Sequence, residues 1–255
     1  MDKFYSLDAG SEMEGKMNGK KIAVVTGAGA GIGQGIVLAL AKEGYKVYAN
    51  GRNEEKLKKT LKQCTGYDVE PLVFDVSKEE EVKEALGALK RIDCLINNAG
   101  VGVNKAVDEI ETADWDLILD TNVKGYFFVI KYALERMGRG GSVVNLSSGA
   151  AKTGGDFVSL PYSVSKGAIN TMTVCYARQL APRGIRVNAV SPGFVDTDML
   201  IINEKISRDY YDNMIPLGRL GLPEDIANTV AFLLSDKAEF ITGQVWEVNG
   251  GDIMG

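Results

Sequence analysis

Histidine is missing altogether from this sequence of 255 residues. It is the usual general base near neutral pH, the commonest metal ligand, and the partner of nucleophilic Ser and Cys side chains. Its absence excludes every Ser-His and Cys-His nucleophile. Any catalysis must therefore depend on other residues.

Cysteine is scarce, and no long apolar run is present. The three cysteines, Cys64, Cys94 and Cys175, are far apart and odd in number, which fits neither a disulfide framework nor a metal site. No apolar run approaches the roughly 18 residues of a membrane span, and the N-terminus lacks the apolar core of a secretion signal. We therefore expect a soluble cytoplasmic protein with no bound metal and no membrane partner.

Positive charge is also in deficit. The net charge is -5, and no run of five or more basic residues occurs. Such a chain has no long-range attraction for a phosphate backbone. We therefore expect no nucleic acid partner.

What the sequence does contain is a regular alternation of short apolar segments and longer amphipathic ones. The short segments predict strands over 21–25, 45–50, 70–74, 92–97, 141–146, 185–190 and 244–248, and the longer ones predict helices over 31–43, 54–64, 78–89, 112–137, 162–181 and 223–234. This order predicts an α/β fold, a single doubly wound Rossmann-type domain over residues 21–255 with a seven-stranded parallel sheet and helices on both faces. Residues 1–20 are polar and aperiodic, so we predict a disordered N-terminal extension there.

The first predicted strand runs into a glycine-rich turn, VVTGAGAGIG, which opens the first predicted helix. Its spacing is T-G-x-x-x-G-x-G, formed by Thr26, Gly27, Gly31 and Gly33. Glycines allow the backbone to approach a ligand closely, and the free N–H groups of the helix start then face a pyrophosphate. The alternative is a tight turn that only packs the helix against the sheet. Because the turn follows the first strand of a βαβ series, we predict a dinucleotide site.

The end of the second predicted strand bears on which dinucleotide binds. An acidic residue there would hold the ribose 2′-hydroxyl of NAD, but this chain has Gly51 and Arg52. Arginine meets a phosphate through two parallel hydrogen bonds, so we predict NADP(H) in preference to NAD(H). The alternative is that Arg52, Lys56 and Lys59 form an ordinary solvated helix start. Ala30 stands where a second basic residue would strengthen the preference.

Eight motifs occur in order along the chain: TGAGAGIG, FDVS, NNAG, TNVKG, NLSS, YSVSK, RVNAVSPG and GQVWEVNGG. Together they resemble the short-chain dehydrogenase/reductase family from residue 21 to residue 251. The resemblance implies a Rossmann-type sheet, hydride transfer with a nicotinamide cofactor and, often, a homotetramer. The segment SPGFVDTDM most resembles that of 3-oxoacyl-acyl-carrier-protein reductases, for which Arg139 and Arg183 would contact an acidic carrier.

The resemblance also implies which residues contact the cofactor: Gly27, Gly31, Ile32, Gly33, Arg52, Asp75, Val76, Asn98, Tyr162, Lys166, Val195 and Thr197. In this pattern Asp75 accepts a hydrogen bond from the adenine amino group, and Thr197 contacts the nicotinamide carboxamide. Each has a structural alternative as the cap of the following helix. Asn97 is expected only to brace the turn after the fourth strand.

Tyr162 and Lys166 stand four residues apart in a predicted helix, so their side chains share one face. Alone, such a pair is usually an edge contact, but the neighbouring motifs match it to the catalytic pair of the family. Tyrosine titrates near 10, so acid–base work near pH 7 requires a pKa lowered by about 3 units. We expect the Lys166 ammonium to supply part of that shift.

Two further catalytic residues are implied by the resemblance. Ser148 is expected to hold the substrate oxygen, with Ser147 as the structural alternative. Asn122 is expected to hold a water for proton relay together with Lys166. The alternative for Asn122 is that it satisfies the backbone of a kinked helix.

The expected function is an oxidoreductase that transfers a hydride between NADP(H) and a carbonyl or alcohol substrate, of 3-oxoacyl or other partly apolar type and either free or carrier-bound. The alternatives are a sugar or polyol dehydrogenase using NAD(P), and a non-catalytic cofactor-sensing protein. A nucleotide-sugar epimerase fits less well because its glycine turn is usually spaced differently. Residues 198–217, rich in Met, Ile and Tyr, are predicted to form a lid over the substrate, with an amphipathic surface helix as the alternative.

Overall fold

The computed structural model describes residues 19–155, 158–200 and 208–254, and its centre is a parallel sheet of seven strands in the order β3-β2-β1-β4-β5-β6-β7. The strands are β1 Ile22–Val25, β2 Lys46–Asn50, β3 Val69–Leu72, β4 Cys94–Asn97, β5 Ser142–Leu146, β6 Arg186–Pro192 and β7 Val245–Val248. Every neighbouring pair is parallel. The predicted Rossmann-type architecture is confirmed.

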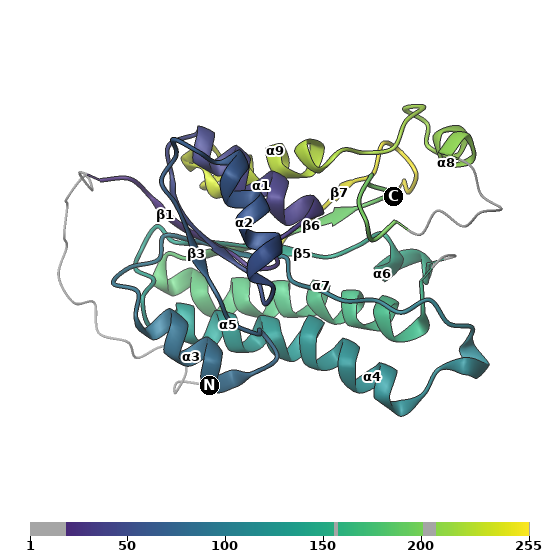
Figure 1. Cartoon of the computed structure of the whole chain (residues 1–255), viewed down its shortest axis with the longest axis horizontal. Helices are drawn as coiled ribbons and strands as arrows, with labels where there is room; N and C mark the ends of the chain where they lie inside the picture. The colour runs from purple at the N-terminus through teal and green to yellow at the C-terminus, as the bar shows by residue number, and fades with distance from the viewer. Residues whose placement is uncertain (1–18, 156–157, 201–207, 255) are drawn as a thin grey trace.

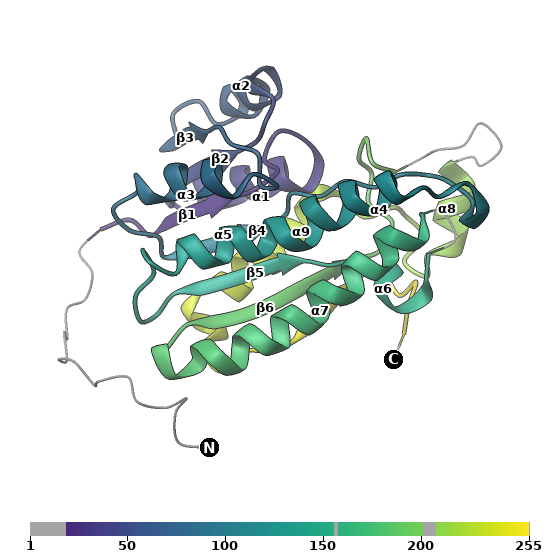
Figure 2. The same cartoon turned by 90° about the horizontal axis from the view of Figure 1, so that it is seen from below.

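Helices cover both faces of the sheet (Figure 1, Figure 2). One face carries α1 Gly31–Lys42 and α9 Pro223–Leu234, and the other carries α3 Glu79–Gly87, α5 Gly125–Ala133 and α7 Leu160–Leu180. The helix α2 Glu54–Gln63 follows β2 and lies beside α1. The two layers bury the central strands β4 and β5 completely, as a parallel sheet requires, while the edge strands β3 and β7 are only partly buried.

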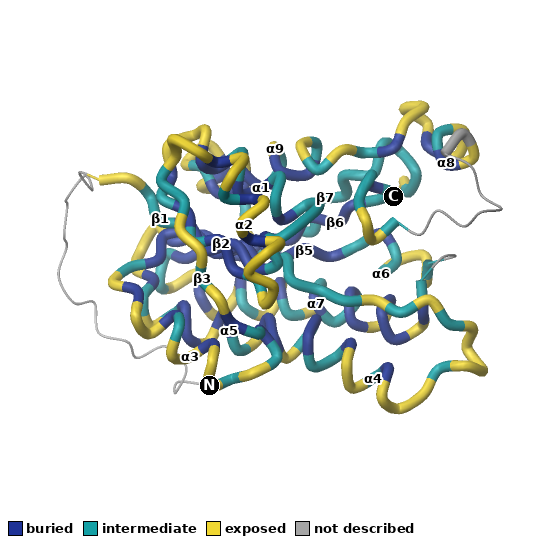
Figure 3. The backbone as a smooth tube through the Cα atoms, viewed as in Figure 1, coloured by how far each residue is buried: buried dark blue, intermediate teal, exposed yellow. Residues whose placement is uncertain are grey.

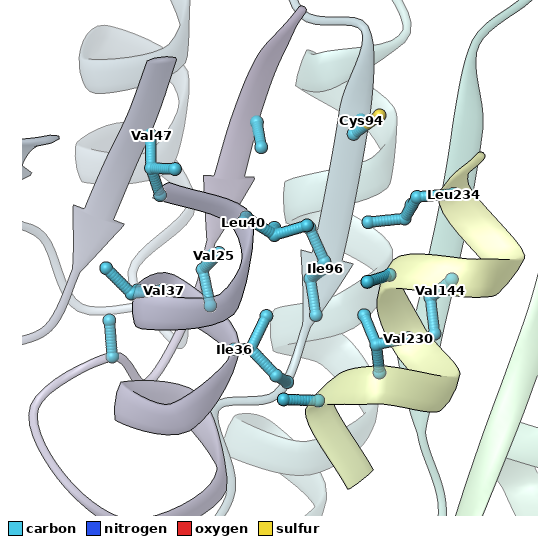
Figure 4. Close-up of a cluster of buried hydrophobic side chains, with 14 of the residues drawn as sticks. Val25, Ile36, Val37, Leu40, Val47, Cys94, Ile96, Val144, Val230 and Leu234 are labelled. Atoms are coloured by element: carbon cyan, nitrogen blue, oxygen red, sulfur yellow. The ribbon is translucent and has the colours of Figure 1, made fainter. Parts of the chain in front are cut away.

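The core on the α1 and α9 face is built from aliphatic side chains of the central strands. Val25 and Ile96 of β1 and β4 meet Ile36 and Leu40 of α1 and Val230 of α9, and all five are fully buried (Figure 4). Burying one such side chain stabilises the fold by about 1.5–3 kcal/mol. Figure 3 shows the same division along the chain, with buried strands at the centre and exposed outer faces on the helices.

The parallel arrangement brings four loops to one edge of the sheet. The chain leaves β1, β4, β5 and β6 at their carboxyl ends, and these four strands are adjacent in the sheet. The strand order reverses between β1 and β4, and ligands of open α/β sheets bind at such a switch point. Most of the candidate functional residues lie in these four loops and in the helices that follow them, while Arg52 follows β2 and Asp75 and Val76 follow β3.

The helix predicted over 112–137 is interrupted. The helix α4 Thr112–Leu119 ends in a π-helical turn, Asp120–Lys124, before α5 begins at Gly125. Within this turn the Asn122 side chain bonds both backbone groups of Val101 at 2.8 and 2.9 Å. The apolar pattern of the sequence does not reveal this turn. The hydrogen bonds that stabilise it are made with Val101, which lies in a distant loop.

Some expectations differ from the structure or fall outside it. The short helices α6 Ala150–Thr153 and α8 Arg208–Met214 were not predicted separately. The helix α8 lies within the 198–217 segment, for which the alternative to a lid was a surface helix. Of the predicted extension, residues 1–18 lie outside the described residues, and so do 201–207 of the predicted lid. No helix in the described ranges is long and apolar enough to cross a bilayer.

Candidate active site

The glycine turn joins β1 to α1 in the way that its sequence predicts. Gly27 has φ +66°, a conformation that favours glycine, and a Cβ there would lie 2.7 Å from Ala99 Cα. Asn98 braces the turn, since its Nδ2 donates to Thr26 O and Gly27 O, both at 3.0 Å. The helix α1 begins at Gly31, and the N–H groups of a first helical turn have no acceptor within the helix. They are available to a ligand.

The bracing role predicted for Asn97 is therefore wrong. Asn97 is fully buried and donates from Nδ2 to Asn145 Oδ1 at 2.9 Å, and Asn145 donates to Thr173 Oγ1 at 3.0 Å. This chain of amides links β4 through β5 to α7. Successive side chains of a strand point to opposite faces, so the fold decides which of the two neighbouring asparagines reaches the turn.

A cleft of about 720 Å³ lies over the glycine turn and the carboxyl ends of β1, β4 and β5. Most of the predicted cofactor residues line it: Gly27, Gly31, Ile32, Gly33, Arg52, Asn98, Tyr162, Lys166 and Thr197. Backbone N–H groups without Cβ atoms suit a pyrophosphate, and the arginine beyond them suits a further phosphate. The residues present therefore fit a dinucleotide.

Asp75 and Val76 lie apart from this cleft, in the loop after β3. Asp75 Oδ1 accepts from the backbone N–H and the hydroxyl of Ser77 at 2.9 and 2.8 Å, and Asp75 Oδ2 lies 3.2 Å from Arg52 Nη1. Burial raises the pKa of Asp75, but the bonds from Ser77 and Arg52 outweigh it, and the pKa falls below its ordinary value. Lys78 occupies the N-cap position of α3 without a side-chain capping bond, so the alternative role of Asp75 as the helix cap is wrong. Val76 is buried against Gly125.

Tyr162 and Lys166 are brought together by the first two turns of α7, as the spacing predicts. Both are buried, and Lys166 Nζ lies 5.5 Å from the centroid of the Tyr162 ring. Lys166 donates to Leu146 O, at the end of β5, at 2.8 Å. Burial lowers the pKa of Lys166 to about 8. The lysine is thus held by the sheet on one side and by the tyrosine helix on the other.

The lowered pKa predicted for Tyr162 is not produced by the described residues. Burial raises the pKa of the phenol, and a hydrogen bond with Ser148 only partly offsets this effect. The Lys166 ammonium is bound to Leu146 O at 2.8 Å. Tyr162 therefore keeps its proton near neutral pH, which suits a group that donates a proton to a substrate.

The two serines after β5 have different surroundings. Ser148 is hydrogen-bonded to Tyr162 and accepts from Ala150 N at 3.2 Å. Ser147 is buried and donates to the backbone oxygen of Lys166 at 3.3 Å. Ser148 thus stands beside the phenol, while Ser147 fastens β5 to α7.

Asn122 is held by structural bonds. Besides its two bonds to Val101, its Nδ2 donates to Ser165 Oγ at 3.1 Å, and the side chain is completely buried. Both Asn122 Oδ1 and Lys166 Nζ lie within 4 Å of the position that a Cβ on Gly100 would occupy. These contacts match the alternative role of satisfying helix and loop backbone, and they hold the loop after β4 against the catalytic helix.

A second cavity, of about 370 Å³, opens on the other side of Tyr162. It shares Ile32, Ser147, Tyr162, Pro192, Thr197 and Met199 with the first cleft. Its lining is mainly apolar, with Val158, Val195, Leu200, Met214 and Ile253 beside the tilted rings of Phe194 and Tyr211, but it also includes the polar Ser148, Thr153 and Asp252. Tyr162 therefore stands at the boundary between a dinucleotide-shaped cleft and an apolar pocket.

Sequence comparison identifies relatives over nearly the whole chain. The family described as enoyl-(acyl carrier protein) reductase matches residues 27–252. The 3-oxoacyl-(acyl-carrier-protein) reductase FabG of Staphylococcus aureus is 40% identical over 243 residues, which are 92% of this chain and 98% of that protein. The enzyme of the same name from Thermotoga maritima is 36% identical over 241 residues, which are 91% and 97% of the two chains.

The chain belongs to the short-chain dehydrogenase/reductase family. Solved structures agree with this assignment. A short-chain dehydrogenase/reductase from Brucella melitensis, described as a glucose/ribitol dehydrogenase, superposes with a TM-score of 0.87 at 33% identity, covering 92% of this chain and 97% of that one. An actinorhodin polyketide ketoreductase with NADPH gives a TM-score of 0.84 at 33% identity, covering 91% and 97%.

As a short-chain dehydrogenase/reductase, the chain is an NAD(P)-dependent oxidoreductase that transfers a hydride between a nicotinamide cofactor and a carbonyl or alcohol. Thr197 lies where the two cavities of this enzyme meet. Its Oγ1 donates to Val195 O at 3.4 Å, and its carbonyl accepts from Leu200 N at 2.9 Å in a turn. It caps no helix in the part of the chain that the structure describes.

Sequence reasoning missed two groups of residues in this short-chain dehydrogenase/reductase. Tyr126, one turn after Asn122, is buried with its hydroxyl 3.2 Å from Leu146 O, which also accepts from Lys166. Tyr126 follows Asn122 by four residues in the predicted helix, and this spacing could have placed the two side chains on one face. Val158, Phe194 and Ile253 of the second cavity had no such signal, because the fold brings them together from distant parts of the chain.

Proposed function

We propose that this enzyme reduces 3-oxoacyl thioesters, carried on an acyl-carrier protein, with NADPH. The position of Tyr162 between the dinucleotide cleft and the apolar pocket carries the proposal. Apolar walls with few polar groups suit an acyl chain better than a polyhydroxylated substrate. Relatives named 3-oxoacyl-(acyl-carrier-protein) reductases and a ketoreductase solved with NADPH support the same substrate and cofactor.

In the proposed reaction the bound nicotinamide supplies a hydride to the carbonyl carbon. Tyr162 donates its proton to the carbonyl oxygen, so that hydride and proton together yield the alcohol. Ser148, bonded to Tyr162, donates a hydrogen bond to the negative charge that develops on that oxygen. Lys166, held by Leu146 O, orients the cofactor and favours the phenolate formed when Tyr162 loses its proton.

The remaining predicted residues hold these groups in place. Gly27, Gly31, Ile32, Gly33 and Asn98 form or brace the pyrophosphate turn. Thr197 lines both cavities, Val195 lines the second, and Asn122 positions the loop after β4. Arg52, with Asp75 behind it, takes the 2′-phosphate, while Val76 supports this loop from within the core.

Replacing Ser148 with alanine is expected to lower kcat by about 10²-fold, the usual effect of losing one donor to a developing oxyanion. The matched control is Ser147→Ala, which removes a hydroxyl of the same kind from the adjacent position. Among the described residues that hydroxyl bonds only the backbone oxygen of Lys166, at 3.3 Å, so kcat should stay within about 5-fold. Equal losses in both variants would contradict the assignment of Ser148.

A substrate panel tests the proposed function directly. Purified enzyme is assayed by nicotinamide absorbance with 3-oxoacyl thioesters of increasing chain length, on acyl-carrier protein and on a small thiol. Sugars and polyols are assayed with the oxidised cofactors, and NADPH is compared with NADH throughout. Turnover confined to sugars or polyols would establish the dehydrogenase alternative instead. Cofactor binding without any turnover would establish the sensing alternative.

The proposal extends to carrier, assembly and location. Arg139 remains a candidate contact for an acidic carrier, whereas Arg183 is engaged with Leu134 O and Met137 O at 2.7 and 3.2 Å. Exposed apolar side chains on α4, α5 and α7, namely Leu117, Phe127, Val164 and Val174, suit burial in a homotetramer. Three free cysteines suit the reducing cytoplasm. Residues 21–255 are proposed to act as one domain, with 198–217 as a lid over the apolar pocket.

A further inference from the structure

Lys56 occupies an unexpected place beside the glycine turn. It lies in the first turn of α2, it is exposed, and it lines the dinucleotide cleft together with Arg52. A Cβ added to Gly29 would lie 3.0 Å from Lys56 Cβ. Because Gly29 has no side chain, the start of α2 packs directly against the turn that faces the pyrophosphate. The stem of Lys56 therefore begins at the turn itself.

The charge of Lys56 is also uncompensated. Within the described part of the chain, its ammonium takes part in no hydrogen bond or ion pair. Arg52 differs, since Asp75 Oδ2 lies 3.2 Å from its Nη1. The two opposite charges cancel, so a phosphate bound near Arg52 is also repelled by the Asp75 carboxylate behind it.

The third cation among the described residues of the cleft lies elsewhere. Lys166 is buried beside Tyr162 and bound to Leu146 O. At the α2 end of the cleft, the cations are therefore Arg52, with an acidic partner, and Lys56, without one. A phosphate that carries close to two negative charges needs more positive charge than the Arg52–Asp75 pair supplies.

We propose that Lys56 is a second determinant of NADPH specificity and binds the 2′-phosphate together with Arg52. Lysine acts as a mobile point charge on a long stem, while arginine supplies directed pairs of hydrogen bonds. Lys56 thus takes the place of the basic residue that is absent at Ala30, and it reaches the same turn from α2. The inference rests on the NADPH dependence in the proposed function.

The test measures ligand binding rather than turnover. Dissociation constants of NADPH, NADH, adenosine 2′,5′-bisphosphate and 5′-AMP are measured by calorimetry for wild type, Lys56→Ala and Lys56→Arg. The alanine variant should bind NADPH and the bisphosphate about 5- to 10-fold more weakly, the effect of one charge-assisted bond at a partly exposed site. NADH and 5′-AMP should change by less than about 2-fold, and the arginine variant should retain the preference.

Lys59 supplies the matched control. It lies on the same helix and lines a neighbouring hollow with Lys56, but it is not among the residues of the dinucleotide cleft. Lys59→Ala removes the same charge, and the ratio of NADH to NADPH dissociation constants should stay within about 2-fold of wild type. Since both lysines are exposed, thermal melting should show both variants folded.

The outcomes separate this inference from the proposed function. In one outcome, wild type binds the bisphosphate more tightly than 5′-AMP, and Lys56→Ala keeps that preference in full. This result would overturn the role of Lys56 but not the NADPH dependence. An equal weakening of NADPH and NADH would also overturn it, because it would show that Lys56 only packs the turn. Wild type that binds both nucleotides equally would overturn NADPH dependence as well, whereas failure of the carbonyl panel leaves the binding result standing.

Discussion

Replacing Tyr162 with phenylalanine is expected to abolish carbonyl reduction, with kcat falling by about 10³-fold, within the usual contribution of a positioned proton donor. The phenol is buried at the boundary of the two cavities and bonded to Ser148. Burial raises its pKa, so the proton is present to be donated. Phenylalanine keeps the ring and the shape of the site, so NADPH should bind within about 2-fold of wild type.

The measurement pairs kcat from nicotinamide absorbance with a cofactor dissociation constant from fluorescence titration. Tyr126→Phe is the matched control, because it removes a buried hydroxyl that bonds Leu146 O at 3.2 Å but that lies outside the described lining of both cavities. It should cost about 1 kcal/mol of stability, with most of the turnover retained. Residual turnover above a tenth of wild type in Tyr162→Phe would contradict proton donation by this residue.

Replacing Gly33 with alanine is expected to damage both stability and cofactor binding. The added Cβ would lie 2.2 Å from Gly27 O and 2.5 Å from Asn98 Nδ2, and neither atom is free to move. Gly27 is part of the positive-φ turn, and Asn98 braces it through two hydrogen bonds. Forcing the turn open should lower the free energy of unfolding by about 2–3 kcal/mol, a usual cost of overpacking. The N–H groups that face the pyrophosphate should be displaced with it.

Gly87→Ala is the control for this change. Gly87 ends α3, and a Cβ there would meet nothing within 4 Å. Because alanine loses less backbone entropy than glycine on folding, this variant should be stabilised by about 0.5–1 kcal/mol. Chemical denaturation measures the free energy of unfolding of the two variants, and titration with NADPH measures their affinity for the cofactor. A Gly33→Ala protein with wild-type stability and affinity would show that close approach is not the reason for glycine here.

Predictions that rest on local pattern agree with the structure. The seven strands form one parallel sheet, because each short apolar segment can be buried on both faces only between two layers of helices. The glycine turn takes its predicted place between β1 and α1. Tyr162 and Lys166 share a helix face because the helix period requires it.

Predictions that depend on distant contacts fare differently. Asn98 rather than Asn97 braces the turn, Asp75 does not cap α3, and the helix predicted over 112–137 contains a π-helical turn around Asn122 and ends at Ala133. The outcomes for the three asparagines depend on partners on other elements, which no local spacing reveals. The pKa of Tyr162 belongs with them, since its direction depends on how deeply α7 is buried and where the Lys166 ammonium points.

The sequence by itself determined the strand and helix order, the dinucleotide turn, the Tyr162–Lys166 pair and the absence of any histidine chemistry. These follow from residue type and from spacings of two to four residues, within which the chain geometry is set by the backbone. Only the tertiary structure decided that Ser148 rather than Ser147 meets the phenol, that an apolar pocket adjoins Tyr162, and that Lys56 lies against Gly29. Such contacts join elements far apart in the chain, and they form only when the packed sheet brings the carboxyl ends of its strands to one edge.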